Sequence, residues 1–335
     1  MPGGPMTASP QTLRASYALC RRIARRSGSN FYPAMLLLSP ARRQAMEALY
    51  AFLRHTDDLA DADLPLAIRQ DRLERWRSVV AGTLNEAAAA PDSPPAPLRH
   101  PTPSNASAAV ATEDGPTACV FPDDSMAEAM LPALAHTVRC FAIPEAYLWA
   151  VLEGVSRDLA HRGFETFEEL AEYCRLVASA VGRACLCIWG AHREEALPLA
   201  DQCGVAFQLT NILRDMGEDA ARGRVYLPRA DLAASGYPVE ALLRREHQAG
   251  LENVVLCLAE RARVAYRIGA DLFDLLDGEG QRVFGLMFSV YGQLLEEVVR
   301  RRRDLLRRRI RLAWWRKAAL AARWTLLAPR KPALA

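Results

Sequence analysis

The sequence predicts an all-α fold, because its apolar residues recur with helical periodicity and nowhere with the alternation of strands. Between residues 11 and 80 they lie three and four positions apart, as at Met46, Leu49 and Leu53, and the pattern resumes near Met126. Hydrophobic residues make up 51% of the 335-residue chain, which is enough to bury a large core.

We expect the helical pattern to be interrupted in three places. The Ser39-Pro40 step breaks the first stretch, since proline is disfavoured inside a helix. Residues 82–125 are rich in Ala, Pro, Ser and Thr, and this composition predicts a disordered insertion. Residues 223–238, with the sequence GRVYLPRADLAASGYP, predict a loop between two long helices.

The composition argues against several classes of protein. The eight cysteines are scattered without a CxxC pair, so neither a zinc site nor a disulfide framework is indicated. No stretch approaches the roughly 18 uncharged apolar residues of a membrane span. The N-terminus also lacks the apolar core of a secretory signal, and we therefore expect a cytoplasmic protein.

The net charge of +3 is unevenly distributed, because residues 300–317 carry nine arginines and one lysine against a single acid, Asp304. This basic arm favours peripheral contact with the anionic inner face of a membrane, and a salt-bridged terminal helix is the alternative. No nucleic-acid-binding module accompanies it, so a nucleic-acid partner is not expected. The apolar residues interleaved with the basic ones are Leu305, Leu306, Ile310, Leu312, Trp314, Trp315 and Trp324.

An acidic cluster, RHTDDLAD at residues 54–61, lies within the first helical stretch. Asp57 and Asp61 are four positions apart and therefore project from one face of a helix. Like charges at this spacing weaken a helix by a few tenths of a kcal/mol, so helix stability does not favour the pair. A bound cation would explain it.

A second cluster, QLTNILRDMGED at residues 208–219, repeats this spacing with Asp215 and Asp219, and Gln208 and Asn211 extend the polar stripe. Burying these carboxylates among apolar neighbours would be costly without partners. Hard oxygen ligands suit Mg²⁺, which is often held by a few carboxylates and substrate phosphates. One such cluster is usually a solvated helix face, but two of them favour a site for Mg²⁺ and diphosphate. Neither an EF-hand nor a glycine-rich phosphate loop is present.

Several segments resemble the squalene/phytoene synthase family. SNFY at residues 29–32 resembles the family's opening helix, and residues 48–61 resemble its first aspartate motif. Residues 167–182 resemble its central helix. The strongest match is the second aspartate motif, residues 208–219, followed by RGRVYLP at 222–228.

This resemblance implies a single helical domain of the isoprenoid synthase type over residues 11–317, interrupted by the insertion and followed by a tail at 318–335. It implies a central apolar cavity with the two aspartate motifs facing each other across its mouth. The implied reaction is the Mg²⁺-dependent, head-to-head joining of two geranylgeranyl or farnesyl diphosphates through a cyclopropylcarbinyl diphosphate. The products would be phytoene, dehydrosqualene or squalene.

The resemblance also implies roles for individual residues. The residues implied to hold two or three Mg²⁺ ions with the substrate diphosphate are Asp57, Asp61, Asp158, Asn211, Asp215 and Asp219. The implied diphosphate contacts are Arg54, Gln208, Asn211, Arg214, Arg224 and Tyr226. Tyr173 joins the four motif aspartates as a catalytic residue, since it would face the carbocation. The implied pocket residues are Phe31, Val177, Gly182, Phe207 and Tyr291.

Alternatives remain open from the residues alone. Arg54 and Arg214 each lie within a turn of an aspartate, so intrahelical ion pairs would also explain them. A terpene cyclase uses similar aspartates, and an inactive relative could serve as a membrane-associated assembly protein. The sequence does not select the C15 or C20 substrate, the product, or the oligomeric state. NADPH is possible but not indicated: no GxGxxG fingerprint is present, and squalene synthases bind NADPH without one.

Overall fold

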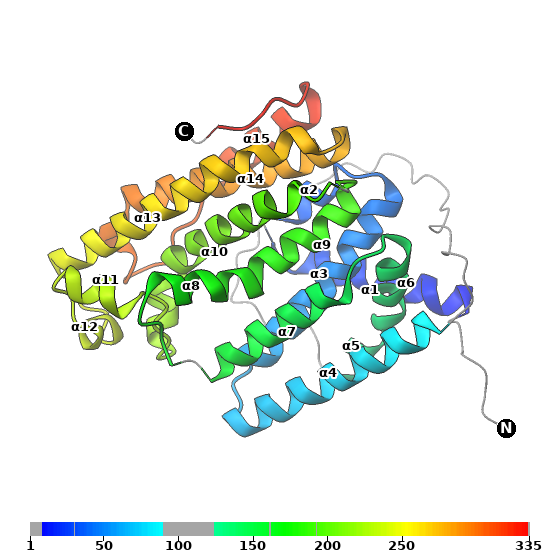
Figure 1. Ribbon diagram of the computed structural model, residues 1–335, viewed down its shortest axis with the longest axis horizontal. Coiled ribbons are helices and arrows are strands. Elements are labelled where there is room, and N and C mark those ends of the chain that lie inside the picture. Colours follow the sequence, from blue (N-terminus) through cyan, green and yellow to red (C-terminus); the bar gives the residue numbers. More distant parts are fainter. Residues whose placement is uncertain (1–8, 30, 90–123, 161, 192, 334–335) are drawn as a thin grey trace. The chain divides into compact units, whose positions relative to one another are not determined.

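The computed structural model describes residues 9–29, 31–89, 124–160, 162–191 and 193–333 (Figure 1). These residues form both short and long helices, and no strand occurs among them. The predicted all-α class is therefore confirmed.

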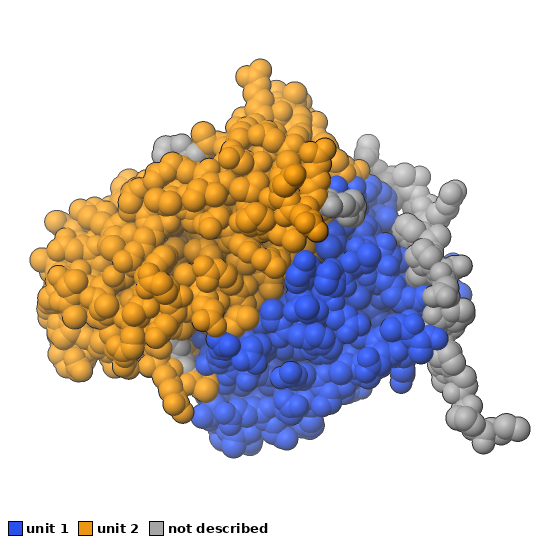
Figure 2. Space-filling view, in the orientation of Figure 1, with its two compact units in different colours: residues 1–159, 187–190 blue, residues 160–186, 191–335 orange. Residues whose placement is uncertain are grey.

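The contacts divide the chain into two compact units (Figure 2). Unit 1 comprises residues 1–159 and 187–190, and unit 2 comprises residues 160–186 and 191–335. We describe each unit by itself.

Unit 1 is built from seven helices in the described part of the chain, and α1 and α3 each begin with a proline at the first helical position. The helices are α1 (Pro10–Arg26), α2 (Tyr32–Met35), α3 (Pro40–Asp61), α4 (Leu66–Ala88), α5 (Asp124–Glu128), α6 (Leu131–Cys140) and α7 (Glu145–Leu159). Helix α3 contacts α1, α4, α6 and α7, so it forms the centre of the unit.

The C-terminal half of α3 is fixed against α4 by Trp76. Its ring stacks on Phe52 at a centroid distance of 6.2 Å, and it meets the edge of His55 at 4.5 Å. The indole Nε1 of Trp76 also donates a hydrogen bond to the Thr56 hydroxyl, at 3.1 Å. These contacts hold the turn of α3 that carries Asp57.

Helix α4 continues to Ala88, so the predicted start of the insertion at Gly82 is too early. The prediction assigned LNEAAAA at residues 84–90 to the insertion because of its composition, although alanine is the strongest helix former. Residues 90–123 of the predicted insertion lie outside the described residues.

Unit 2 is organised around the 26-residue helix α10, which packs most extensively on α13. The elements before the second aspartate motif are α8 (Phe167–Cys174), the π-helical turn η1 (Arg175–Ser179) and α9 (Ala180–Trp189), whose last residues belong to unit 1. The others are α10 (Ala196–Ala221), α11 (Arg229–Ala234), α12 (Val239–Leu243), α13 (Ala249–Gly269), the 3₁₀ turn η2 (Ala270–Leu275), α14 (Gly278–Arg300), the 3₁₀ turn η3 (Arg302–Asp304) and α15 (Trp314–Leu326).

Buried aromatic residues hold α10 in place. The hydroxyls of Thr210 and Tyr266 of α13 are hydrogen-bonded at 3.0 Å, and Phe207 lies 5.7 Å from the Tyr266 ring. The predicted loop at residues 223–238 is only partly irregular, because it contains α11. Pro228 occupies the N-cap position of this helix, where its missing backbone N–H removes no helical hydrogen bond.

The basic arm is more closely packed than its sequence pattern predicts. The apolar residues Leu305, Leu306, Ile310, Leu312 and Trp324 are buried, so the interpretation of these five as lipid-facing is wrong. Within the described ranges, no helix combines the length and apolar character needed to span a bilayer.

Candidate active site

The first acidic cluster lies at the C-terminal end of α3 in unit 1. Arg54 binds Asp58 one turn away, with 2.5 Å between Nη2 and Oδ1, so the intrahelical ion pair predicted as an alternative is present. This pair draws Asp58 into the protein, where it is buried. Asp57 and Asp61 instead keep solvent-exposed faces. The two residues implied to bind metal are thus the accessible members of the cluster.

Asp57 is surrounded by protein atoms and by other carboxylates. Desolvation by the surrounding protein, followed by the charge of Asp61, raises the pKa of Asp57 to about 7, and Asp58 and Asp158 add to the effect. Part of the side chain is nevertheless exposed. The two observations agree, because protein atoms and carboxylates can crowd a group that keeps one accessible face. A divalent cation would relieve this repulsion.

Asp158 reaches the same cluster from the end of α7. Asp158 is 101 positions from Asp57 in the sequence, yet its negative charge contributes to the raised pKa of Asp57. Helix α7 packs on α3, and this packing brings the third carboxyl close. The structure therefore brings Asp57, Asp61 and Asp158 together within unit 1.

The second cluster forms a half-buried polar stripe along α10 in unit 2, comprising Gln208, Asn211, Asp215 and Asp219. The Oδ1 atom of Asn211 is buried and has no hydrogen-bond partner among the described residues. An unsatisfied buried carbonyl oxygen is costly, and it is the kind of ligand that Mg²⁺ accepts. This orphaned atom and the crowding at Asp57 are the two observations that fit bound Mg²⁺.

Asp215 is held by two guanidinium groups. Arg214 beside it in α10 donates from Nε to Oδ1 at 2.7 Å, so a local ion pair is again present. Arg309 from the basic arm approaches the same carboxylate, with 2.8 Å between its Nε and Oδ1. It also lies 3.7 Å from Glu218. Sequence reasoning missed Arg309 as a site residue, and its only signal was the basic character of the arm.

Aromatic residues line the remainder of the site in unit 2. The rings of Tyr173 and Tyr226 stack at 5.7 Å, and Phe164 lies 5.4 Å from Tyr173. Both tyrosines are buried. The predicted pocket residues Phe207 and Tyr291 stack at 4.8 Å. Two aromatic groups therefore accompany the polar stripe.

Tyr291 contacts residues of the second aspartate motif. Burial raises its pKa, while the charge of Arg214 and hydrogen bonds with Arg214 and Asn211 lower it. The hydroxyl thus stays protonated and helps to hold Asn211 of the stripe and the neighbouring Arg214. Its expected role in the pocket remains a prediction.

Val177 lies in the turn η1 and is half-buried. A Cβ at Gly204 of α10 would overlap the backbone of Ser179, so the glycine permits close approach of α10 and η1. Gly182, in α9, is also half-buried and lies close to Ala200. Single π-helical turns often mark functional sites, and nothing in the sequence predicted this one.

The other predicted residues are placed less decisively. Phe31 is half-buried immediately before α2 in unit 1. Arg224 is half-buried after α10, and its backbone N–H donates to the carbonyl of Asp219 at 2.9 Å. Among the described residues, no group of three or more His, Cys, Asp and Glu side chains is arranged as a ready-made metal site.

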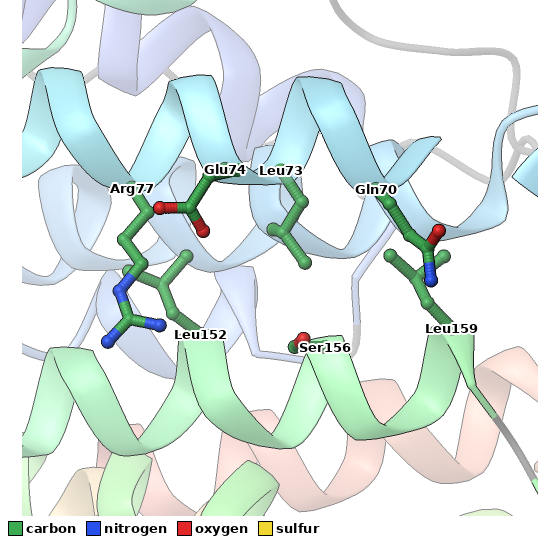
Figure 3. A pocket seen from close by; sticks show the side chains of 7 residues that line it. All are labelled: Gln70, Leu73, Glu74, Arg77, Leu152, Ser156 and Leu159. Atoms are coloured by element: carbon green, nitrogen blue, oxygen red, sulfur yellow. The ribbon is translucent and has the colours of Figure 1, made fainter. Parts of the chain in front are cut away.

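A pocket of about 270 Å³ lies in unit 1 between α4 and α7 (Figure 3). Its lining combines leucines with polar rim residues and includes none of the predicted site residues; it consists of Gln70, Leu73, Glu74, Arg77, Leu152, Ser156 and Leu159. It is therefore not the predicted central apolar cavity, which remains a prediction.

Comparison with known proteins identifies the architecture. The sequence profile described as squalene/phytoene synthase matches residues 24–316. A phytoene synthase of Arthrospira platensis is 28% identical over 334 residues, covering 93% of each chain. A presqualene diphosphate synthase of Sinorhizobium fredii is 28% identical, covering 90% of this chain and 94% of the relative. The crystal structure of a dehydrosqualene synthase with a ligand superposes with a TM-score of 0.75 at 25% identity, covering 94% of this chain and 96% of that one.

Proposed function

The chain belongs to the squalene/phytoene synthase family, and we propose that it is a prenyltransferase that joins two prenyl diphosphates head to head. The observation that carries this proposal is the pair of acidic helix stripes, Asp57 with Asp61 on α3 and Asp215 with Asp219 on α10. The substrates are farnesyl or geranylgeranyl diphosphate. The product is phytoene, dehydrosqualene or squalene, formed through a cyclopropylcarbinyl diphosphate.

Asp57, Asp61 and Asp158 in unit 1, and Asn211, Asp215 and Asp219 in unit 2, would hold Mg²⁺ together with the substrate diphosphate. The bound metal supplies positive charge that stabilises the departing diphosphate. The proposed number is two or three ions. Arg54, Arg214, Arg224, Gln208 and Tyr226 would bind the diphosphate oxygens, Arg54 and Arg214 by exchanging part of their present ion pairs.

The reaction begins when the allylic C–O bond of one substrate breaks and its electron pair leaves on diphosphate. The resulting cation alkylates the double bond of the second substrate, and loss of a proton closes the cyclopropane ring. The stacked rings of Tyr173 and Tyr226 present aromatic faces that stabilise a passing cation. The buried hydroxyl of Tyr173 is the proposed group for moving the proton.

The proposed location is the cytoplasm, with peripheral contact at the inner face of the membrane through the basic arm. Such contact would give a hydrocarbon product direct access to the lipid phase. The intact carboxylates favour an active enzyme over the alternative, an inactive assembly protein.

The decisive experiment is incubation of the purified chain and Mg²⁺ with farnesyl or geranylgeranyl diphosphate, with and without NADPH, followed by mass analysis. We expect a C30 or C40 product. A cyclised C15 or C20 product would instead identify a terpene cyclase. Asp219→Asn should lower turnover on the order of 10²–10³-fold or more with an unchanged melting temperature, because it removes a metal ligand. Wild-type turnover in this variant would contradict the proposed site.

A further inference from the structure

Helix α15 is firmly attached to α14 through its inner face. Trp324 is 1% exposed, and its ring packs where a Cβ at Gly285 of α14 would overlap it. The indole Nε1 donates to the Ser289 hydroxyl at 3.1 Å. Arg282 of α14 donates to the terminal carbonyls of α15, reaching the Trp324 oxygen at 2.6 Å and the Leu327 oxygen at 3.1 Å. The C-terminal end of α15 therefore has a fixed orientation.

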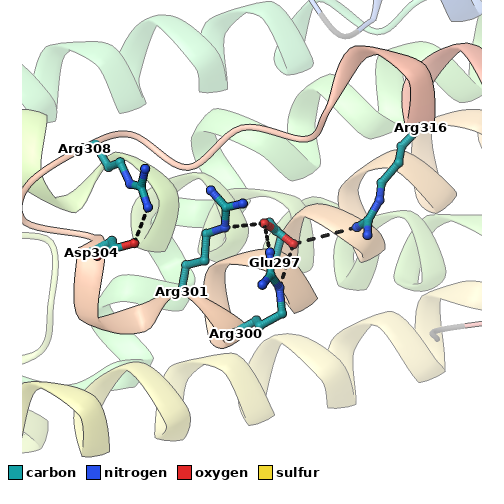
Figure 4. Close-up of polar contacts among 6 residues, drawn as sticks. All are labelled: Glu297, Arg300, Arg301, Asp304, Arg308 and Arg316. Carbon is teal, nitrogen blue, oxygen red and sulfur yellow. Dashed lines mark hydrogen bonds and ion pairs between the residues drawn. The ribbon is translucent and has the colours of Figure 1, made fainter.

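The N-terminal end of α15 is held by charge (Figure 4). The carboxylate of Glu297, a buried residue of α14, accepts hydrogen bonds from Arg300 and pairs with Arg301. Arg316 of α15 lies 3.7 Å from the same carboxylate. Figure 4 shows the guanidinium groups of Arg300, Arg301 and Arg316 converging on Glu297. Both ends of α15 are thus anchored to one neighbour.

An exposed apolar stripe runs along the outer face of α15. Trp315, Ala319, Ala322 and Leu326 are spaced by four, three and four positions, which places them on one stripe of a helix, and all four are exposed. Trp315 is 57% exposed and Leu326 is 79% exposed. We call these four residues the α15 stripe. Trp314 and Leu327, at the two ends of the helix, are also exposed.

Helix α15 carries Arg316, Lys317 and Arg323 and no acidic residue, although Lys331 beyond it pairs with Asp271 and Asp274 of η2. Beyond Asp304 the sequence contains nine arginines and lysines and no acidic residue. Arg307 and Arg323 are exposed, and Arg323 is fixed on the flank of α15 by its guanidinium, which lies 4.9 Å from the centre of the Trp324 ring. Exposed tryptophan and leucine on a helix whose own charged residues are all basic are the pattern of helices that lie in a membrane interface.

We propose that the α15 stripe inserts into the interface of an anionic lipid membrane, with α15 parallel to the membrane plane and the flanking arginines on the lipid headgroups. This surface differs from the one that the sequence pattern predicted, since most apolar residues of the basic arm are buried in the protein. The inference deepens the proposed membrane contact and rests on it for its purpose, because a hydrocarbon product dissolves only in lipid.

A second copy of the chain is a poorer occupant of the α15 stripe. The stripe spans 11 positions, about 16 Å along the helix, and two of its four residues are alanine. A specific protein interface buries roughly 1,200 Å² or more. Pairing two copies here would also bring two copies of α15 together, each with a net positive charge of its own, and their repulsion opposes association. Anionic headgroups remove that repulsion.

The test is flotation of the full chain with vesicles of phosphatidylcholine alone or with about 30% phosphatidylglycerol. We expect binding to the anionic vesicles only, and weaker binding as salt is raised, because salt screens the arginines. The double variant Trp315→Ser, Leu326→Ser should lose at least about tenfold in vesicle affinity with unchanged helix content. The matched control, Val264→Ser with Ile268→Ser, removes two exposed apolar residues of α13 and should bind as the wild type does.

A second variant, Arg323→Glu, tests the charge on the flank of α15 without touching the stripe, and it should also lose at least about tenfold. Equal binding by the wild type and both variants would overturn the proposal. So would a wild-type dimer that the stripe variant abolishes, since protein would then cover the stripe. Turnover measured with detergent-dispersed substrate separates the two proposals. A chain that is active but does not bind vesicles contradicts only the proposed membrane insertion of α15. A chain that binds vesicles but is inactive contradicts only the proposed function.

Discussion

Glu47 shows how a single buried carboxyl away from the candidate site controls stability. It lies in α3, is 1% exposed, and its Oε1 has no hydrogen-bond partner in the described part of the chain. Burial raises the pKa of Glu47 from 4.5 to about 7, although Arg21, Arg43 and Arg25 lower it. Between these pH values the folded chain binds a proton that the unfolded chain has released. The free energy of unfolding therefore falls as pH rises from about 4.5 to 7.

We expect Glu47→Gln to remove this pH dependence and to raise the free energy of unfolding at pH 8 by on the order of 2 kcal/mol, because a neutral amide replaces a buried anion. Urea unfolding at about pH 5 and pH 8 measures both effects. Glu86→Gln on the exposed side of α4 is the matched control and should leave the profile unchanged. Persistence of the wild-type pH dependence in Glu47→Gln would assign it to another group.

Arg309 competes with a cation for Asp215. Its guanidinium contacts the carboxylate at 2.8 Å, where a metal ligand is proposed. Arg309→Gln should therefore increase the affinity for Mn²⁺ or Mg²⁺ severalfold in the absence of diphosphate, because it leaves more negative charge at the site. Calorimetric titration measures the affinity. Arg308→Gln is the control, since Arg308 is bound to Asp304 instead. Equal affinity in the wild type and Arg309→Gln would mean that the arginine does not oppose the metal.

At the residue scale, local spacing could be predicted and distant contacts could not. The positions of Asp57 and Asp61 on one face of α3 follow from helical periodicity, and so do those of Asp215 and Asp219. The contact of Arg309 with Asp215 spans 94 positions. It depends on the path that the basic arm takes once Leu305 is buried, and no local pattern encodes that path.

The packing of α15 on α14 can be tested with a single substitution. A Cβ at Gly285 would overlap the ring of Trp324. Gly285→Ala should therefore lower the free energy of unfolding by about 1–3 kcal/mol, the usual cost of an overpacked core. Gly278→Ala in the same helix is the matched control, because nothing lies within 4 Å of its Cβ position. Thermal unfolding measures both variants, and equal melting temperatures would show that α15 gives way without cost.

At the element scale, most helices could be predicted from apolar periodicity, but their ends and irregular turns could not. The helical end of α4 was missed because alanines were grouped with the prolines that follow them in the sequence. The turn η1 depends on the close approach of Gly204 to Ser179, which only the packed structure reveals. The lipid-facing interpretation of the basic arm failed for a similar reason, since the burial of Leu306 and Ile310 depends on tertiary packing.

For the whole molecule, the proposed reaction requires acidic residues that belong to two units. Unit 1 carries Asp57, Asp61 and Asp158, and unit 2 carries Asn211, Asp215 and Asp219. Helical spacing predicted the members on α3 and α10, whereas Asp158 was implied only by the family resemblance. That both halves serve one reaction is part of the proposed function, and it can be tested by kinetics.

Groups that act as a unit in catalysis show strongly non-additive losses when they are removed together. We therefore expect the double variant Asp57→Asn, Asp215→Asn to turn over about as slowly as the slower of the two single variants, because the first substitution already disables the shared step. Independent sites would instead give multiplied losses, each on the order of 10²–10³-fold. Single-turnover rates, measured with the enzyme in saturating excess over substrate and with saturating Mg²⁺, report the chemical step directly. The control pairs Asp57→Asn with the distant, exposed Glu86→Gln, which should add nothing. Multiplied losses in the carboxylate double variant would show that the acidic stripes of the two units act separately.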